Sequence, residues 1–166
     1  MKKIILAASA LLFAALPASA DQLPNRKAGL WEIRVSTEGS PEQVIKQCVD
    51  ETTDAKLQEM GSKLGEACAK NETKKTGSGF SLESDCQFGG SRIQSKGTVT
   101  GDFSSSYSME MSSSYEPALM GVKDGKTKIA GKHVGACAAD QKPGDVIMPG
   151  GQKMNVNQLQ PPAQTK

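Results

Sequence analysis

The sequence predicts a mainly β fold: an antiparallel curved sheet or open barrel of about seven strands, with one short helix and disulfide bridges. Three observations predict it. Apolar residues recur at alternate positions in several stretches, as they do in half-buried strands. Short turns separate these stretches, which favours antiparallel pairing between chain neighbours. Glycines interrupt one long stretch, and a glycine inside a strand often marks a bend where a sheet curls. A flat two-sheet sandwich is the alternative architecture.

The first two strands are predicted early in the chain. The stretch "LWEIRV" places Trp31, Ile33 and Val35 on one face and its charged side chains on the other. After the turn signal "EGSPE", the stretch "QVIKQCV" (43–49) is expected to form the second strand. The first of these strands is therefore expected to be half-buried, with its apolar face toward the core.

A change of period then predicts the helix in "TTDAKLQEMGSKLG". Three apolar residues recur on one helical face, namely Leu57, Met60 and Leu64. Thr53 or Asp54 is expected to cap the first turn, and Gly65 is expected to end the helix.

The second half of the chain predicts a hairpin and three more strands. The stretch "CAKNETKKTGSGFSLESDC" has turn residues around Gly77, and "SRIQSKGTVTGDF", "SSSYSMEMSSSY" and "KTKIAGKHVGAC" each alternate. In the second of these three, tyrosines and methionines share one face, and serines with Glu110 share the other. The predicted core consists of Trp31, Ile33, Val35, Leu57, Leu82, Ile93, Val99, Phe103, Met109, Met111 and Ile129.

The first 20 residues are typical of a signal peptide. Lys2 and Lys3 precede an apolar run, and Ala18-Ser19-Ala20 forms a cleavage site. The apolar run spans residues 4–16, which is short of the roughly 20 residues that cross a bilayer. We therefore expect a periplasmic protein, exported by a cleaved signal peptide, with no membrane span after cleavage.

Three segments follow from this interpretation. Residues 1–20 form the signal peptide, residues 21–137 form a disulfide-bridged β domain, and residues 138–166 form a flexible C-terminal tail. The tail is rich in proline, glycine and glutamine and has no aromatic residue, so it buries too little apolar surface to offset its chain entropy. Only "DVIM" is expected to dock locally.

The charge of the chain argues against nucleic-acid binding. The sequence has 20 Lys and Arg against 18 Asp and Glu, and two of the lysines belong to the signal peptide. The mature chain is therefore close to neutral and lacks the positive excess that phosphate binding requires.

The four cysteines are Cys48, Cys68, Cys86 and Cys137. An even number in an exported chain indicates disulfides, and three pairings are possible. A turn centred on Gly77 places Cys68 opposite Cys86, which favours that bridge and leaves Cys48 for Cys137. A zinc site is the rival interpretation, but the gaps of 20, 18 and 51 residues do not match the close ligand pairs of such sites. We predict no metal.

Several stretches occur in a particular order: "AGLWEIRV", "KQCVDETTD", "GTVTGDFSSSYSMEM" and "GKHVGAC". With the signal peptide and the central cysteines, this order resembles DUF3617, a small exported bacterial family of unknown function, over residues 28–137. The resemblance implies an exported, periplasmic, cysteine-bridged β domain. It implies no catalytic residues, and the chain from Ala138 onward lies outside it.

Catalytic chemistry is not indicated. His133 and Cys137 lie four residues apart on a predicted strand, which separates them by about 13 Å. A Cys/His nucleophile also needs a free thiol, which four paired cysteines do not leave. The acidic residues Asp50, Glu51 and Asp54 lack the spacing of a calcium loop and fit the start of a helix. We predict no catalytic residues, no cofactor and no enzyme.

The predicted function is a binding module for a small apolar ligand or an envelope component. A curled sheet can carry an apolar pocket, and methionine adapts to varied ligands. The side chains expected to line the pocket are Trp31, Tyr107, Met109, Met111 and Tyr115. The alternative for these residues is plain core packing. The alternative function is an envelope-stress or structural protein that acts through protein–protein contacts.

Overall fold

The structure, a computed structural model, describes residues 21–66 and 68–159. These residues form one α-helix, α1 (Glu51–Gly65), one short 3₁₀ helix, η1 (Val156–Gln158), and nine strands. The strands are β1 (Gly29–Thr37), β2 (Gln43–Val49), β3 (Lys70–Thr76), β4 (Gly79–Phe88), β5 (Ser91–Gly101), β6 (Ser106–Leu119), β7 (Val122–Gly135), β8 (Asp145–Ile147) and β9 (Lys153–Asn155). The predicted signal peptide, residues 1–20, lies outside the described residues.

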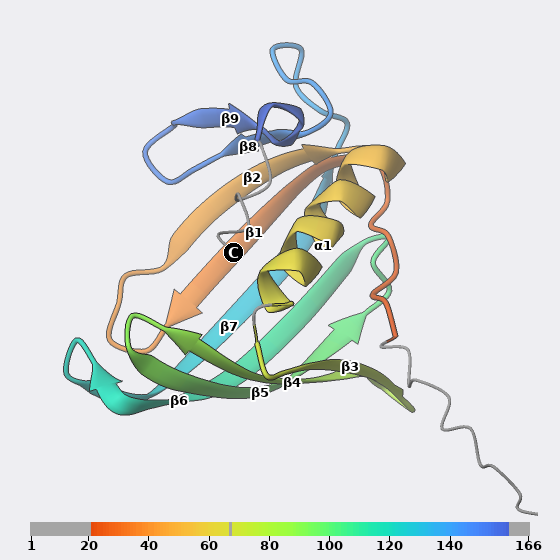
Figure 1. Ribbon diagram of the computed structural model, residues 1–166. Helices are drawn as coiled ribbons and strands as arrows, with labels where there is room; N and C mark the ends of the chain where they lie inside the picture. Colours follow the sequence, from red (N-terminus) through yellow and green to blue (C-terminus); the bar gives the residue numbers. More distant parts are fainter. Residues whose placement is uncertain (1–20, 67, 160–166) are drawn as a thin grey trace, which may run out of the picture.

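All nine strands belong to one antiparallel sheet, in the order β3-β4-β5-β6-β7-β1-β2-β8-β9. The sheet is curved, and α1 lies across its concave side (Figure 1). Among the strands of the described residues, two pairs join strands that are not chain neighbours: β7 with β1, and β2 with β8. The predicted fold class, a mainly β antiparallel open sheet with one helix, is therefore confirmed.

The seven predicted strands correspond to β1–β7, and β2 has the predicted bounds. The alternation of apolar and polar residues along these strands reflects the two faces of the sheet. Positions that face α1 are mostly apolar, whereas the positions between them carry charged side chains and serine in contact with solvent. The strand count is nine rather than seven because β8 and β9 come from the chain beyond Cys137.

The chain beyond Cys137 adds to the sheet. β8 pairs with β2, and the Gly144 backbone N–H donates to the Cys48 carbonyl at 2.8 Å. Val146 and Val156 are buried. The sequence predicts a flexible tail over residues 138–166, whereas the structure places β8, β9 and η1 within residues 145–158. The reason is the bridge between Cys137 and Cys48, which tethers the segment beside β2 and so shortens the loop that docking must close.

Both predicted disulfides are present, and they link Cys48 to Cys137 and Cys68 to Cys86. The register of the β3–β4 hairpin differs by one residue from the predicted one. Phe80 lies opposite Lys75 rather than Lys74, because the turn is formed by two residues, 77 and 78, instead of being centred on one. Cys68 therefore lies just before the paired part of β3 rather than within it.

The helix starts earlier than its sequence predicts. The cap is Asp50, whose carboxylate accepts from the Thr53 backbone N–H at 2.8 Å, while the Thr53 hydroxyl accepts from the Asp50 N–H at 2.9 Å. This reciprocal pair is a capping box. The Thr53 hydrogen bonds also lower the pKa of Asp50. Gly65 is the last helical residue, as predicted.

The core lies between the concave face and α1 and has two clusters. One contains Trp31, Ile33 and Val49, and the other contains Phe80, Val99 and Phe103. Tyr107 packs against both clusters and so joins them. Of the predicted core, Trp31, Ile33, Val99 and Phe103 are fully buried, whereas Val35, Leu57, Leu82, Ile93, Met109, Met111 and Ile129 are half-buried.

We expect the two disulfides to stabilise the fold unequally. In the loop-entropy description, the bridge across 89 residues contributes about 4.5 kcal/mol and the bridge across 18 residues about 3 kcal/mol. Paired Cys→Ser replacement at 48 and 137 should therefore lower the free energy of unfolding more than paired replacement at 68 and 86. Denaturant titration of both variants and the oxidised parent measures this. A larger loss on removing the 68–86 bridge would contradict it.

Candidate functional site

A row of aromatic rings crosses the concave face from β1 to β4. The Trp31 ring lies 5.8 Å from Tyr107, Tyr107 stacks on Phe103 with centroids 5.6 Å apart, and Phe103 meets Phe80 edge-on at 6.4 Å. Such offset and edge-on pairs are favourable beyond the area that they bury. The row supplies a rigid apolar floor beneath α1.

Tyr107 occupies the centre of this floor because its neighbour on β7 is a glycine. Gly131 lies opposite Tyr107 in the register, and a Cβ atom there would lie 2.1 Å from the tyrosine ring. The missing side chain therefore lets the ring lie flat across β7. Burial raises the pKa of the Tyr107 hydroxyl, and the nearby Arg26 guanidinium opposes that shift.

The segment 21–28, here called the N-terminal strap, crosses the concave side and is fixed at several points. The Asp21 backbone N–H donates to the Thr73 carbonyl at 3.0 Å, and its carboxylate accepts from the Lys75 backbone N–H at 2.7 Å. Further along, the Lys27 N–H donates to the Phe103 carbonyl at 2.9 Å. The strap thus runs from the edge strand β3 to the start of β1.

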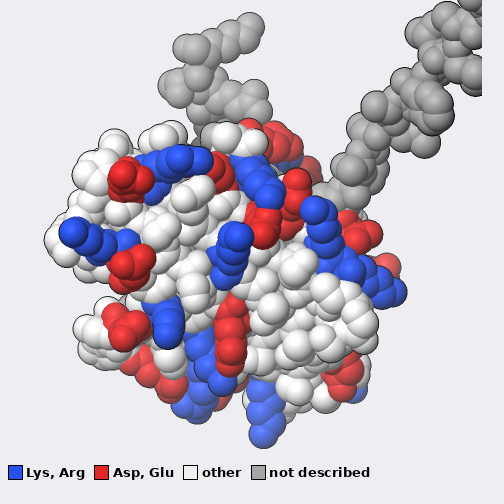
Figure 2. All heavy atoms as spheres, turned by 90° about the horizontal axis from the view of Figure 1, so that it is seen from below, with Lys and Arg blue, Asp and Glu red and all other residues white. Residues whose placement is uncertain are grey.

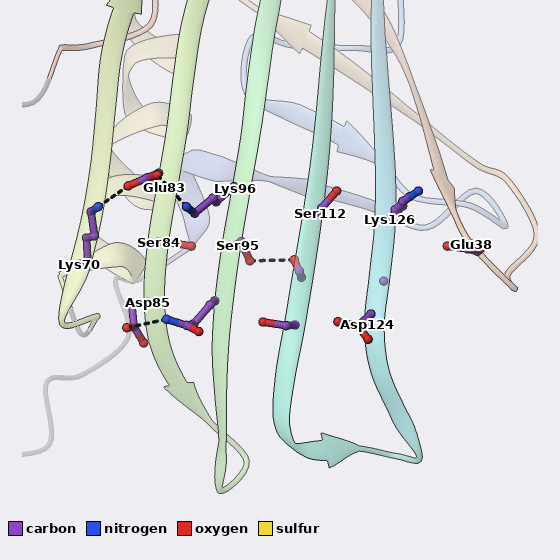
Figure 3. A pocket seen from close by; sticks show the side chains of 14 residues that line it. Glu38, Lys70, Glu83, Ser84, Asp85, Ser95, Lys96, Ser112, Asp124 and Lys126 are labelled. Carbon is purple, nitrogen blue, oxygen red and sulfur yellow. Dashed lines mark hydrogen bonds and ion pairs between the residues drawn. The ribbon is translucent and has the colours of Figure 1, made fainter.

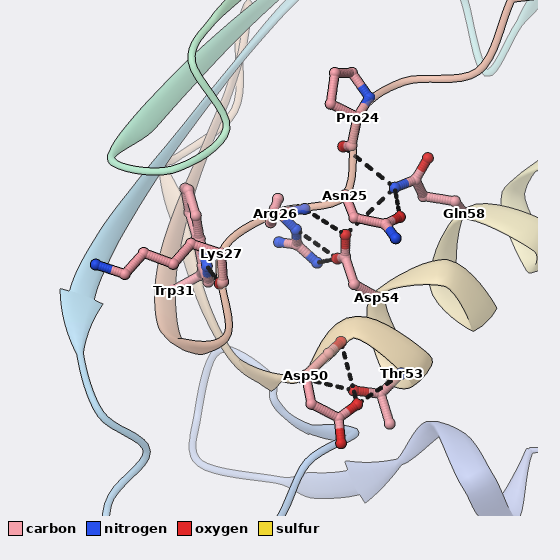
Figure 4. A network of polar contacts seen from close by, with 9 residues as sticks. All are labelled: Pro24, Asn25, Arg26, Lys27, Trp31, Asp50, Thr53, Asp54 and Gln58. Carbon is pink, nitrogen blue, oxygen red and sulfur yellow. Dashed lines mark hydrogen bonds and ion pairs between the residues drawn. The ribbon is translucent and has the colours of Figure 1, made fainter.

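The strongest fixation of the strap is a buried ion pair with the helix (Figure 4). The Asp54 carboxylate accepts from the Arg26 backbone N–H and from Arg26 Nε, both at 2.7 Å, and Arg26 Nη2 lies 2.7 Å from Asp54 Oδ1. The side chains are 10% and 1% exposed. The guanidinium also lies over the Trp31 ring, 5.6 Å from its centroid.

Gln58, one turn further along α1, extends this network. Its amide nitrogen donates to Asn25 Oδ1 at 3.0 Å and lies within 3.4 Å of the Pro24 carbonyl and 3.3 Å of Asp54 Oδ2. With so many partners, the charge of Asp54 is well satisfied despite its burial. Breaking such a pair by removing one partner is far more costly than its net contribution suggests.

A cavity of about 280 Å³ opens between the strap, α1 and the sheet. Its apolar walls come from all three parts of the fold, and its polar groups lie mainly on the strap and helix side. The lining residues are Leu23, Pro24, Arg26, Gln47, Asp54, Leu57, Gln58, Val99, Phe103, Tyr107 and Met109. Its size is close to the lower end of the range for small-molecule sites.

Phe103 reaches this cavity from an unusual backbone conformation. Its φ is 57°, a left-handed value that costs a non-glycine residue on the order of 1 kcal/mol. The Asp102 carboxylate holds the turn by accepting from the backbone N–H groups of Ser104 and Ser105 at 2.8 and 2.6 Å, and from Ser106 at 3.3 Å. These hydrogen bonds hold the pKa of Asp102 well below its usual range.

The structure brings together part of the predicted pocket. Tyr107 and Met109 line the cavity, and Trp31 lies directly behind Tyr107 but is itself fully buried in the core. Met111 and Tyr115 share the face of β6 but lie further along the strand, outside the cavity lining.

His133 has a structural place in the fold. Its ring lies edge-on to Trp31 with centroids 5.5 Å apart, and Nε2 lies 3.0 Å from the Ala28 carbonyl oxygen. Cys137 forms a disulfide with Cys48 and carries no thiol. His133 and Cys137 therefore each have a different partner and do not form a Cys/His pair.

The sequence alone did not identify Arg26 or Gln47 as site residues. It indicated Asp54 only as an acidic residue that fits the start of a helix. A signal for Asp54 was present, because it precedes Leu57 by three residues and therefore shares the apolar face of α1. An acidic residue on a buried helical face needs a cationic partner. Nothing local identifies that partner as Arg26, which lies 28 residues earlier in the chain.

A larger hollow of about 640 Å³ lies on the other face of the sheet, across β4–β7 (Figure 3). Several of its charged side chains are already paired: Glu83 with Lys70 and Lys96, and Asp85 with Arg92, which lies outside the lining. On the face seen in Figure 2, positive and negative side chains are likewise interspersed. Such exposed pairs contribute little, and the residues that line this hollow, apart from one glycine, are all polar or charged, so it offers no apolar wall to a ligand.

Two further features are absent from residues 21–66 and 68–159. No three His, Cys, Asp or Glu side chains there lie close enough together to hold a metal ion. No helix there is long and apolar enough to cross a membrane. The two disulfides indicate oxidising, extracytoplasmic surroundings.

Comparison with known families gives one match. A family model described as "Protein of unknown function (DUF3617)" matches residues 26–137, which include α1, β1–β7 and all four cysteines. No curated protein matches the chain, and no solved structure matches it.

The turn that presents Phe103 should depend on pH through Asp102. Because folding lowers the pKa of this carboxyl, its ionised form contributes stability above the unfolded-state pKa of about 3.9. That contribution is lost as pH falls toward the lower pKa of the folded state. The difference in unfolding free energy between the parent and Asp102→Asn should therefore be largest near neutral pH and shrink in acid. Denaturant titrations across pH measure it, and a constant difference would contradict this role.

Proposed function

Because the chain belongs to the DUF3617 family, whose function is unknown, we propose a role from its structure: an exported, periplasmic binding module that holds a small apolar ligand between α1 and the sheet. The cavity of about 280 Å³ is the observation that carries this proposal. The two disulfides and the signal-like residues 1–20 support the periplasmic location.

The walls of the cavity suit an apolar ligand. Val99 and Phe103 belong to the buried core, and Leu57 closes the cavity from the helix. Met109 is half-buried and unbranched, so its side chain can adapt to ligands of different shape. Burying apolar ligand surface against such walls contributes about 25 cal/mol per Å² removed from water.

We propose a non-catalytic role for the same site. Asp54, the acidic group of the cavity, is held by Arg26 through three short contacts and is therefore poorly placed to accept a substrate proton. His133 lies outside the cavity lining, and all four cysteines are in disulfides. The groups that remain, two amides and a phenol, suit recognition better than proton transfer.

Filling the cavity should abolish binding of a neutral lipophilic probe. We expect N-phenylnaphthylamine to bind the oxidised full-length mature chain with one site and a rise in fluorescence. Met109→Trp, which places a larger side chain in the cavity, should weaken binding at least about tenfold. Met111→Trp is the matched control, because Met111 has the same side chain on the same face of β6 but lies outside the lining. Equal loss in both variants, or no binding by the parent, would reject this site.

A second candidate function, contact with another envelope protein, is favoured by the turns at one end of the sheet. The β4–β5 and β6–β7 turns project from the same end (Figure 3). Phe88, Met120 and Val122 are 70%, 98% and 49% exposed there, and Leu119 packs against Gly89 of the neighbouring turn. Exposed apolar side chains gathered in this way are typical of interaction sites.

Photo-crosslinking tests this second function. A photoreactive residue at position 120 should give a discrete adduct with another protein in intact cells, whereas one at position 75, near the opposite end of β4, should not. Phe88→Ser should reduce the adduct, because it removes the neighbouring apolar side chain. Formation of the same adduct from positions 120 and 75 would reject the turns as a contact site.

A further inference from the structure

The cavity under α1 has a polar end as well as apolar walls. Its lining residues with polar side-chain groups are Arg26, Gln47, Asp54, Gln58 and Tyr107, whereas its remaining lining residues are apolar. A purely apolar ligand would leave the polar groups of that end without partners from the ligand. The arrangement instead suits a molecule with one polar group and a short apolar body.

The charge of the polar end is balanced within the protein. Arg26 directs its backbone N–H, Nε and Nη2 at the carboxylate of Asp54, and the pair is almost wholly removed from solvent. The positive charge that remains on the guanidinium faces the Trp31 ring. A ligand carboxylate entering here would gain little net attraction and would lose its hydration. A ligand ammonium group would likewise gain little net attraction and would lose its hydration.

Neutral groups complete the recognition surface. Gln47 and Tyr107 line the cavity, and their side chains end in an amide and a hydroxyl, each of which can both donate and accept hydrogen bonds. A ligand hydroxyl or carbonyl can pair with such groups without bringing charge into the site. The cavity volume of about 280 Å³ restricts the apolar part to a short chain or a single small ring system.

We propose that the cavity selects neutral amphiphiles, whose head is a hydroxyl or carbonyl group, over anionic or cationic amphiphiles of the same chain. This inference rests on the proposed binding function and deepens it. The ion pair between Arg26 and Asp54 is the positioning element: it fixes the strap that closes the cavity and cancels the charge that would otherwise attract an ionised head.

Three ligands with the same chain test the proposal: octanol, octanoate and octylammonium, at a pH where both charged forms are fully ionised. Trp31, the single tryptophan of the chain, lies behind Tyr107 and reports binding by its fluorescence. Displacement of N-phenylnaphthylamine gives a second measure. We expect octanol to bind at least about tenfold more tightly than either charged ligand, which corresponds to about 1.4 kcal/mol.

Each outcome separates this proposal from the function on which it rests. Binding of none of the three ligands, with no binding of N-phenylnaphthylamine, overturns both. Binding of octanoate or octylammonium as tightly as octanol overturns the selectivity and leaves the binding function standing. A preference for octanol in the parent protein supports both, and it needs no variant.

A charge change in the site gives an independent test. Asp54→Asn keeps the shape of the side chain and removes its charge, so Arg26 is left uncompensated and octanoate should become the preferred ligand of the three. Glu59→Gln is the matched control, since Glu59 also lies on α1 but is exposed and pairs with Lys63. Its preference should stay with octanol. An unchanged preference in a folded, disulfide-bonded Asp54→Asn protein would overturn the role of the ion pair.

Discussion

The contact between Arg26 and Asp54 is the interaction on which the rest of the site depends. It joins two distant parts of the chain, a segment without secondary structure and the first turns of α1, which Gln58 also links through Asn25. Without it, the strap would keep its backbone hydrogen bonds and the weaker side-chain contacts of Asp21 and Asn25, but it would lose its one buried ion pair with the helix. The pair also decides the electrostatic character of the cavity, because a buried cation and a buried anion in contact present almost no net charge to their surroundings.

The two disulfides make this contact possible by fixing the helix. Cys48 lies two residues before the helix cap, Asp50, and Cys68 lies three residues after the last helical residue, Gly65. A disulfide is therefore attached close to each end of α1. The helix has few apolar residues of its own, and only two of its residues are fully buried. Packing alone would therefore hold it weakly against the sheet. The bridges keep Asp54 at a constant height above the aromatic floor.

The sequence predicts those parts of the fold that depend on local period and on cysteine pairing. The sequences of β1 and β6 alternate clearly, and the hairpin brings Cys68 near Cys86 even though its register is shifted by one residue. The site is less predictable because it depends on contacts between distant residues. Met109 and Met111 are equivalent in the alternation of β6, and only the position of α1 places one of them at the cavity. The docking of β8 is also non-local, since it follows from a bridge that closes 89 residues.

The aromatic walls of the cavity and the strap are positioned by contacts within the protein, not by contacts with a ligand. Tyr107 lies flat because Gly131 has no side chain, Phe103 is turned inward by the hydrogen bonds of Asp102, and the strap is held by Arg26. A site with these supports does not have to reorganise when a ligand enters, so little of the binding free energy is lost to ordering side chains. The left-handed backbone at Phe103 fits the same view: strain at that residue persists because the surrounding hydrogen bonds leave it no alternative, and the result is an aromatic wall that faces the cavity whether or not the cavity is filled.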